Sequence, residues 1–130
     1  MVSEEEISLF LGETNGLITK IEEDIIKLEK NPGNSKPIQE LFYVFNGLTR
    51  IIKILNLDNV TKFSYDIEKI LEKANNTGVA ENRIDQFINI MFDNLGILKL
   101  FIDNVKKGEI KDFETEYYDE LRRNFDAFER

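Results

Sequence analysis

The side chains that could carry chemistry in this chain are mostly carboxylates, because the sequence contains neither histidine nor cysteine. Ser-His-Asp and Cys-His nucleophile systems are therefore excluded. Most transition-metal sites and the Glu-x-x-His pairs of di-iron bundles are excluded for the same reason. A calcium or magnesium site built from carboxylates alone remains possible, but the loops at residues 31–35 and 75–78 do not match the EF-hand pattern. We expect no metal site and no cofactor.

Three of the carboxylates, Asp66, Glu68 and Glu72, fall close together on one segment. A catalytic pair of carboxylates needs further groups beside it that bind or polarise a substrate. No motif of that kind adjoins this segment, so we do not expect the chain to be an enzyme.

These carboxylates lie on one of four long segments in which apolar residues recur at three- and four-residue steps. That spacing is typical of amphipathic helices with one buried stripe. The predicted stripes, in chain order, are Ile7, Phe10, Leu11, Leu17, Ile18, Ile21, Ile25 and Leu28; Ile38, Leu41, Phe42, Phe45, Leu48, Ile52 and Leu55; Val60, Phe63, Ile67, Ile70, Leu71 and Ala74; and Ile84, Phe87, Ile88, Met91, Leu95, Leu98, Phe101, Ile102 and Val105.

Polar residues before these segments indicate where the helices begin. Ser3 followed three residues later by Glu6 forms a capping-box pattern, and the acidic first turn suits the helix dipole. Ser35 is expected to cap the second helix, and Asp58 or Asn56 the third.

Four long amphipathic helices joined by short links predict an all-α fold, an antiparallel up-down-up-down four-helix bundle. We assign the bundle to residues 1–108, because Lys106-Lys107-Gly108 is a typical helix end. Residues 109–130 form a further amphipathic helix that begins near Asp112. We expect it to pack on the bundle or to serve in association, as the contact of a homo-oligomer. Its predicted stripe is Phe113, Tyr117, Leu121 and Phe125.

The net charge of −8 disfavours nucleic acid as a partner, because phosphate affinity comes mainly from clustered lysines and arginines. An anionic membrane surface is disfavoured on the same ground. No apolar run is long enough to span a bilayer, and the acidic start is unlike a signal peptide, so we expect a cytoplasmic protein. The acidic runs at residues 4–6 and 22–24 are expected to be solvated.

Several stretches together resemble histidine-phosphotransfer (HPt) domains, most closely the N-terminal phosphotransfer domain of CheA-type chemotaxis histidine kinases. The first helix carries Leu-Glu-x-Asn-Pro at residues 28–32, and the second carries Leu-Phe followed by Leu at residues 41–48. Residues 63–71 resemble the partner helix of that family. The resemblance covers residues 7–108 and implies a module of two-component, phosphorelay signalling.

The functional positions of that family fall on changed residues. The phospho-accepting histidine falls on Asn46, the lysine three residues later on Thr49, and the glycine four residues later on Arg50. On the third helix, a second histidine falls on Tyr65. The glutamate that orients the phospho-accepting imidazole falls on Glu68 and is retained.

These changes predict a scaffold without phosphorelay chemistry. Phosphotransfer needs a nitrogen nucleophile, and the amide nitrogen of Asn46 is delocalised into its carbonyl. Thr49, Thr61 and Ser64 could accept phosphate, but the resulting ester would be a poor donor to a receiver aspartate.

At about 100° per residue, Asn46 lies off the buried stripe. The flank could dock a receiver (response-regulator) or kinase domain, or it could be a solvated helix face. Tyr65 and Glu68 either bond to Asn46 or are unrelated surface residues. For the chain as a whole, the alternative is a structural or oligomerisation bundle without a phosphorelay role. The candidate docking surface around Asn46 is Tyr43, Thr49, Arg50, Lys53, Tyr65 and Glu68.

Overall fold

The computed structural model describes residues 2–129, and within that range the secondary structure is entirely helical. The all-α prediction is therefore confirmed. None of the described helices is long and apolar enough to cross a membrane. In chain order the elements are α1 (Glu4–Lys30), α2 (Lys36–Ile52), the 3-10 helix η1 (Lys53–Leu55), α3 (Asp58–Thr77), the 3-10 helix η2 (Glu81–Arg83), α4 (Ile84–Lys106) and α5 (Thr115–Glu129).

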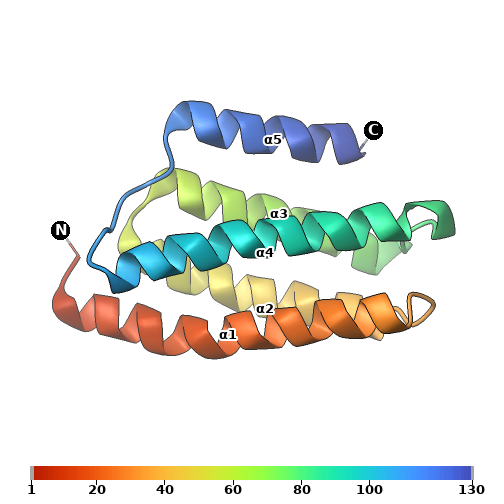
Figure 1. Cartoon of the computed structure of the whole chain (residues 1–130), viewed down its shortest axis with the longest axis horizontal. Helices are drawn as coiled ribbons and strands as arrows, with labels where there is room; N and C mark the ends of the chain where they lie inside the picture. Colours follow the sequence, from red (N-terminus) through yellow and green to blue (C-terminus); the bar gives the residue numbers. More distant parts are fainter. Residues whose placement is uncertain (1, 130) are drawn as a thin grey trace.

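Helices α1 to α4 run alternately in opposite directions along one axis, which is an up-down-up-down arrangement (Figure 1). Helix α1 packs against α2 and α4, and α2 packs against α3. The predicted stripes supply this core, although four members of the α1 stripe are only half-buried: Ile7, Leu11, Leu17 and Ile18.

The start of α1 follows the sequence prediction. The Ser3 hydroxyl accepts a hydrogen bond from the Glu6 amide at 3.1 Å, and the Glu6 carboxylate accepts one from the Ser3 amide at 3.1 Å. At α2, Ser35 occupies the capping position but its side chain makes no cap hydrogen bond. Asn34 accepts from the Lys36 amide instead, at 3.1 Å.

The cap of α3 comes from a distant part of the chain, so the prediction of Asp58 or Asn56 is wrong. The backbone position before the helix is Leu57. Asp112, in the connector between α4 and α5, accepts hydrogen bonds from the amides of Asn59 at 3.0 Å and Val60 at 2.9 Å. Asp112 thus satisfies amide donors that the first turn of α3 cannot pair internally.

Helix α5 lies along the bundle beside α3 (Figure 1). Its aromatic side chains pack against α3 and α4. The ring centroid of Phe63 on α3 lies 5.8 Å from that of Phe125 and 5.6 Å from that of Phe113. Leu121, Phe125 and Phe128 are buried, whereas Tyr117, at 41% exposed, is not. The apolar face of α5 is therefore part of the core.

A polar contact also holds the middle of α5 on α3. The buried carboxylate of Asp66 accepts hydrogen bonds from the Tyr118 hydroxyl at 2.6 Å and from Arg122 at 2.8 Å. Burial, together with the hydrogen bond to Asp66, raises the pKa of Tyr118 to about 12. The neutral phenol is thus the form that this contact stabilises.

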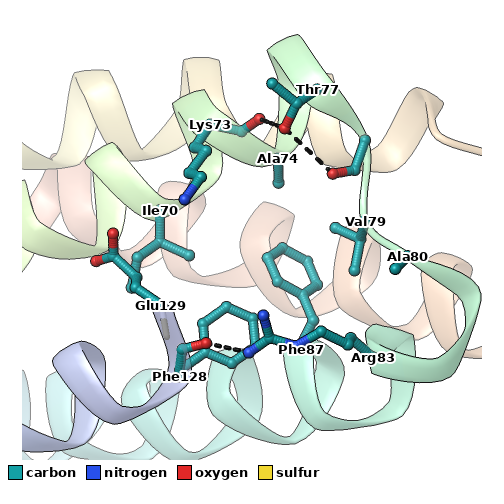
Figure 2. A pocket seen from close by; sticks show the side chains of 11 residues that line it. Ile70, Lys73, Ala74, Thr77, Val79, Ala80, Arg83, Phe87, Phe128 and Glu129 are labelled. Atoms are coloured by element: carbon teal, nitrogen blue, oxygen red, sulfur yellow. Dashed lines mark hydrogen bonds between the residues drawn. The ribbon is translucent and has the colours of Figure 1, made fainter.

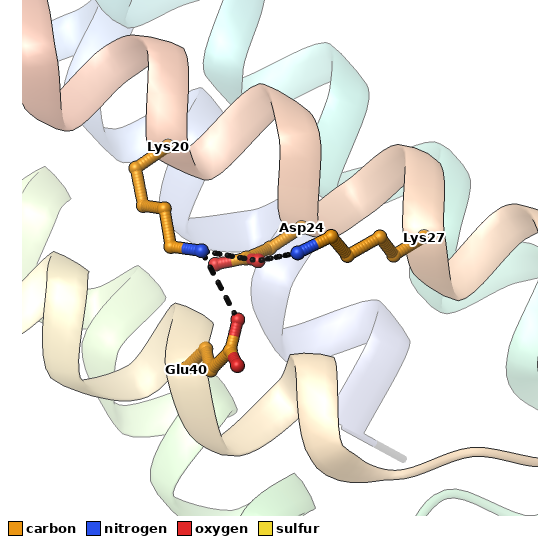
Figure 3. A network of polar contacts seen from close by, with 4 residues as sticks. All are labelled: Lys20, Asp24, Lys27 and Glu40. Carbon is orange, nitrogen blue, oxygen red and sulfur yellow. Dashed lines mark hydrogen bonds and ion pairs between the residues drawn. The ribbon is translucent and has the colours of Figure 1, made fainter.

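A second polar cluster joins α1 and α2 (Figure 3). The Asp24 side chain is fully buried, so the expectation that residues 22–24 are solvated is wrong for this residue. Lys20 Nζ lies 3.3 Å from Asp24 Oδ1 and 3.3 Å from Glu40 Oε2, and Lys27 Nζ lies 3.9 Å from Asp24 Oδ1. The Lys20 ammonium hydrogen bonds to Glu40, and within residues 2–129 no N–H or O–H group donates a hydrogen bond to the Asp24 carboxylate, although Asp24 can donate to Glu40 when it is protonated.

Burial raises the pKa of the Asp24 carboxyl to about 6, with the nearby Glu40 carboxylate adding to the effect and Lys20 opposing it. Hydrogen bonding to Asp24 and to Lys20 lowers the pKa of Glu40. The two carboxyl groups therefore titrate as a pair, in which Asp24 holds the proton to the higher pH.

Candidate functional site

The candidate site lies on the flank of α2 that turns away from the core. Tyr43 is 61% exposed and Asn46 is half-buried. Arg50, one turn further along, is exposed, and so is Lys53 at the start of η1. The helical phase inferred from the sequence thus holds for these four residues.

Thr49 does not belong to this exposed flank, and its assignment to the docking surface is corrected. Its side chain is buried at 3% exposure and faces α3, where Ser64 is fully buried. The two hydroxyl oxygens lie 2.7 Å apart. Thr49 also donates to the Phe45 carbonyl at 2.9 Å, so its hydroxyl accepts the proton of Ser64. Thr49 and Ser64 are interior residues that join two helices.

This contact fixes the relative height of α2 and α3. The helices are antiparallel and rise equally per residue, so each step back along α2 matches one step forward along α3. Starting from Thr49 opposite Ser64, three steps place Asn46 level with Ile67. Glu68 is the next residue along α3, about 1.5 Å beyond that level, and it is half-buried.

The remaining residue of the candidate surface, Tyr65, is 48% exposed on α3. Its ring lies under the Lys69 ammonium, with 5.0 Å between the nitrogen and the ring centroid. In the described part of the chain, neither Tyr65 nor Glu68 forms a hydrogen bond with Asn46. The polar link between the two helices runs through Thr49 and Ser64.

Two cations on this flank are left without an acidic neighbour. Within residues 2–129, no carboxylate lies within ion-pair distance of Arg50 or Lys53, whereas Lys20, Lys99 and Arg122 are all paired. In a chain with a net charge of −8, the flank beside Asn46 thus keeps local positive charge.

The side chains gathered at this site offer hydrogen bonds and charge. A carboxamide is a hydrogen-bond donor and acceptor but not a nucleophile, and the nearby hydroxyls of Thr49 and Ser64 are buried. No group of three acidic residues within residues 2–129 is placed to hold a metal ion.

A separate hollow of about 150 Å³ lies at the far end of the bundle, between α3, η2, α4 and α5 (Figure 2). The Arg83 guanidinium packs over the ring of Phe128, 4.5 Å from its centroid, and donates a hydrogen bond to the Phe128 carbonyl. Phe87 lies beside the same ring, with 6.2 Å between centroids. This contact could not be predicted from the sequence, because Arg83 precedes a helix and carries no motif that links it to residue 128.

Comparison with known proteins finds a similarity to the chemotaxis protein CheA of Borreliella burgdorferi. The two sequences are 25% identical over 97 residues, which is 75% of this chain and 11% of that protein. The chain is similar to a segment of CheA. No protein-family model matches the chain, and no solved structure matches it.

This similarity supports the resemblance inferred from residues 7–108 at a coarse level. The chain is thus a helical bundle that is similar to part of a chemotaxis protein. The chain spans about a tenth of the CheA that it matches, so the activity of that whole protein does not carry over to it.

Proposed function

We propose that this chain is a CheA-like, HPt-type module that cannot carry phosphate and that acts by docking a signalling domain. The observation that carries the proposal is Asn46. It lies on the accessible flank of α2 at nearly the height of Glu68, where the family would hold its phospho-accepting histidine. The scaffold is retained, and the nucleophile is replaced.

The loss of phosphotransfer follows from the chemistry of the amide. Reversible transfer requires a nitrogen lone pair that can form a high-energy phosphoramidate, and the lone pair of Asn46 is conjugated with its carbonyl. The chain has no histidine that could replace it. We also propose that the chain has no enzymatic activity of its own.

The proposed partner is a receiver domain or a kinase domain. A receiver presents an acidic site, and Arg50 and Lys53 offer two exposed cations beside Asn46 that no carboxylate of residues 2–129 pairs. Tyr43 and Tyr65 add exposed aromatic surface, which is common at the centre of protein interfaces. Charge of this kind mainly increases the association rate and the specificity.

The alternative is a structural or oligomerisation bundle with no signalling partner. Leu121, Phe125 and Phe128 are buried against the bundle, so association through α5 would have to use the outer side of that helix. Sedimentation of the chain against a version that ends at Gly108 would separate the two ideas, because the alternative requires loss of an oligomer on truncation.

Titration of the labelled chain with an activated receiver domain, followed by NMR, tests the docking proposal. We expect shifts around Asn46, Arg50 and Lys53, and weaker binding after Arg50→Ala with Lys53→Ala. Substituting Lys30 and Lys36 with alanine is the matched control, since it removes the same charge where α1 ends and α2 begins, at the opposite end of α2 from Lys53. Equal weakening by both pairs, or no shifts near Asn46, would contradict docking at this surface.

A further inference from the structure

A groove runs along the molecule between α4 and α5. The backbones of these two helices approach less closely than those of α3 and α5. A hollow of about 310 Å³ lies between α4 and α5, and a second of about 390 Å³ lies between α4, the connector that follows it and the start of α5. Ile97 lines both hollows. The two hollows therefore adjoin each other at Ile97 along the groove.

Apolar side chains remain accessible along this groove. Leu100 on α4 is 64% exposed and Tyr117 on α5 is 41% exposed, while Ile90 and Ile97 are half-buried. All four line one of the two hollows. An apolar channel between two helices is the kind of surface that accepts the apolar face of a third helix.

A buried polar group in the groove lacks a partner. Asn94 lines the hollow beside Ile97, its side chain is only 7% exposed, and its Nδ2 has no acceptor within the described residues. A buried donor that is left unpaired is unfavourable, and native structures contain few of them. An occupant that brings an oxygen atom to Asn94 would remove this cost.

The charge of the groove is negative. Asp93 and Glu109 line it, against the single cation Lys111 among the same lining residues; Asp112 also lines it, but its carboxylate is bound by the first turn of α3. Glu120 lies close enough to add to the effect of burial in raising the pKa of Tyr117. A second copy of this chain, with its net charge of −8, would bring like charge to this groove, whereas a basic segment would be attracted.

We propose that the groove between α4 and α5 binds a basic amphipathic helix of a partner protein. Its apolar face contacts Ile97, Leu100 and Tyr117, and its cations lie along the acidic rim. The portion of α4 from Ile90 to Asn104 is about 21 Å long, enough for roughly four helical turns. The surface around Asn46 lies on α2 and α3, so the two binding sites can be tested independently.

The probe is a synthetic helical peptide of about 18 leucines and lysines, with leucine at three- and four-residue steps. We expect it to bind the full chain and to shift the NMR signals of Ile97, Leu100 and Tyr117 and of the Asn94 side-chain amide. A peptide of the same composition in scrambled order should not bind. A peptide with glutamate in place of lysine should not bind either.

One matched pair of variants and one further variant distinguish this groove from general attraction to an acidic protein. Leu100→Glu should weaken binding of the leucine-lysine peptide by about tenfold or more. Leu9→Glu introduces the same charge at an exposed leucine of α1 and should have little effect. Asn94→Ala should weaken binding without lowering the melting temperature, whereas a residue with only a structural role would lower it.

Four results would overturn the proposal. The leucine-lysine peptide could fail to bind, the scrambled peptide could bind equally well, or Leu9→Glu could weaken binding as much as Leu100→Glu. The fourth is a dimer of the chain, seen by sedimentation, that Leu100→Glu dissociates. In that case the occupant of the groove would be a second copy.

Discussion

The hydroxyl oxygens of Thr49 and Ser64 lie 2.7 Å apart in the interior between α2 and α3. Thr49 stands where the HPt resemblance places a lysine, and Arg50 where it places a glycine. Thr49 is part of the core, and Arg50 is an exposed cation beside Asn46. In the proposed module, Asn46 and these two neighbours thus all differ from the residues that the resemblance places there.

The hydrogen bond between Thr49 and Ser64 should contribute measurably to stability. Removing either hydroxyl leaves a buried partner unsatisfied, so Thr49→Val and Ser64→Ala should each lower the free energy of unfolding by about 1 kcal/mol. The double variant should lose less than the sum of the two, because the residues interact directly. Urea denaturation of the four proteins measures this coupling.

Thr19→Val serves as the control for that experiment. Thr19 also donates to the carbonyl four residues earlier, but it is exposed and has no partner on another helix. Additive effects of the Thr49 and Ser64 variants would contradict a direct bond between α2 and α3.

Asp24 should make the stability of the bundle depend on pH. Its pKa is about 6 in the folded chain, above its ordinary value of 3.8, so the folded state holds this proton more tightly than the unfolded state. The stabilisation that this bound proton gives the folded state is complete below about pH 4, and it is lost as the pH rises through 6. Asp24→Asn should therefore stabilise the chain at pH 7.5, by on the order of 2 kcal/mol, and the gain should disappear near pH 4.

The control for the Asp24 variant is Asp103→Asn, which removes an exposed carboxylate on α4 paired with Lys106 at 3.9 Å. Thermal unfolding of both variants from pH 4 to 8 provides the comparison. A gain for Asp24→Asn that did not change with pH would contradict the raised pKa.

Asp112 should contribute more to the stability of α3 than Asp58, the acidic residue at the start of that helix. Asp112→Ala removes the acceptor of the Asn59 and Val60 amides and should cost about 1–2 kcal/mol. Hydrogen exchange at those two amides should become faster. Asp58→Ala is the matched control, and it should cost less because no Asp58 side chain caps the helix. A larger loss for Asp58→Ala would contradict the cap from the connector.

Restoring the histidine should restore phosphate acceptance if the scaffold has kept its geometry. Asn46→His places an imidazole at nearly the height of Glu68, which is the residue that orients it in the resembling family. We expect acid-labile phosphate on this variant after incubation with a CheA-type kinase core and ATP, and more of it when Arg50→Gly is added. Absence of phosphate from both folded variants would contradict a retained site geometry.

Local patterns were sufficient to predict most of the fold. The stripe from Val60 to Ala74 is buried as expected, and Ser3 and Glu6 form the predicted capping box. Both depend on residues that lie within a few positions of one another, where helical geometry relates sequence spacing directly to space. Gly108 adopts a positive φ of 86° after α4, in line with the predicted helix end.

The sequence-based predictions that were wrong concern contacts between residues far apart in the sequence. Asp112 caps a helix that begins more than fifty residues earlier, and Asp24 is buried because α2 brings Glu40 beside it. Short-range patterns contain no information on either contact. Thr49 lies at the edge of the predicted stripe, where a small rotation decides between solvent and core, and the bond with Ser64 fixes that rotation.

The central claim is that this module does not carry phosphate, and one measurement tests it most directly. The unaltered chain is incubated with a CheA-type kinase core and radiolabelled ATP, beside a histidine-containing CheA-type phosphotransfer domain as a positive control. Each protein is then treated with acid and with base. We predict acid-labile, base-stable phosphate on the control and none on this chain. Acid-labile phosphate on this chain would contradict the account.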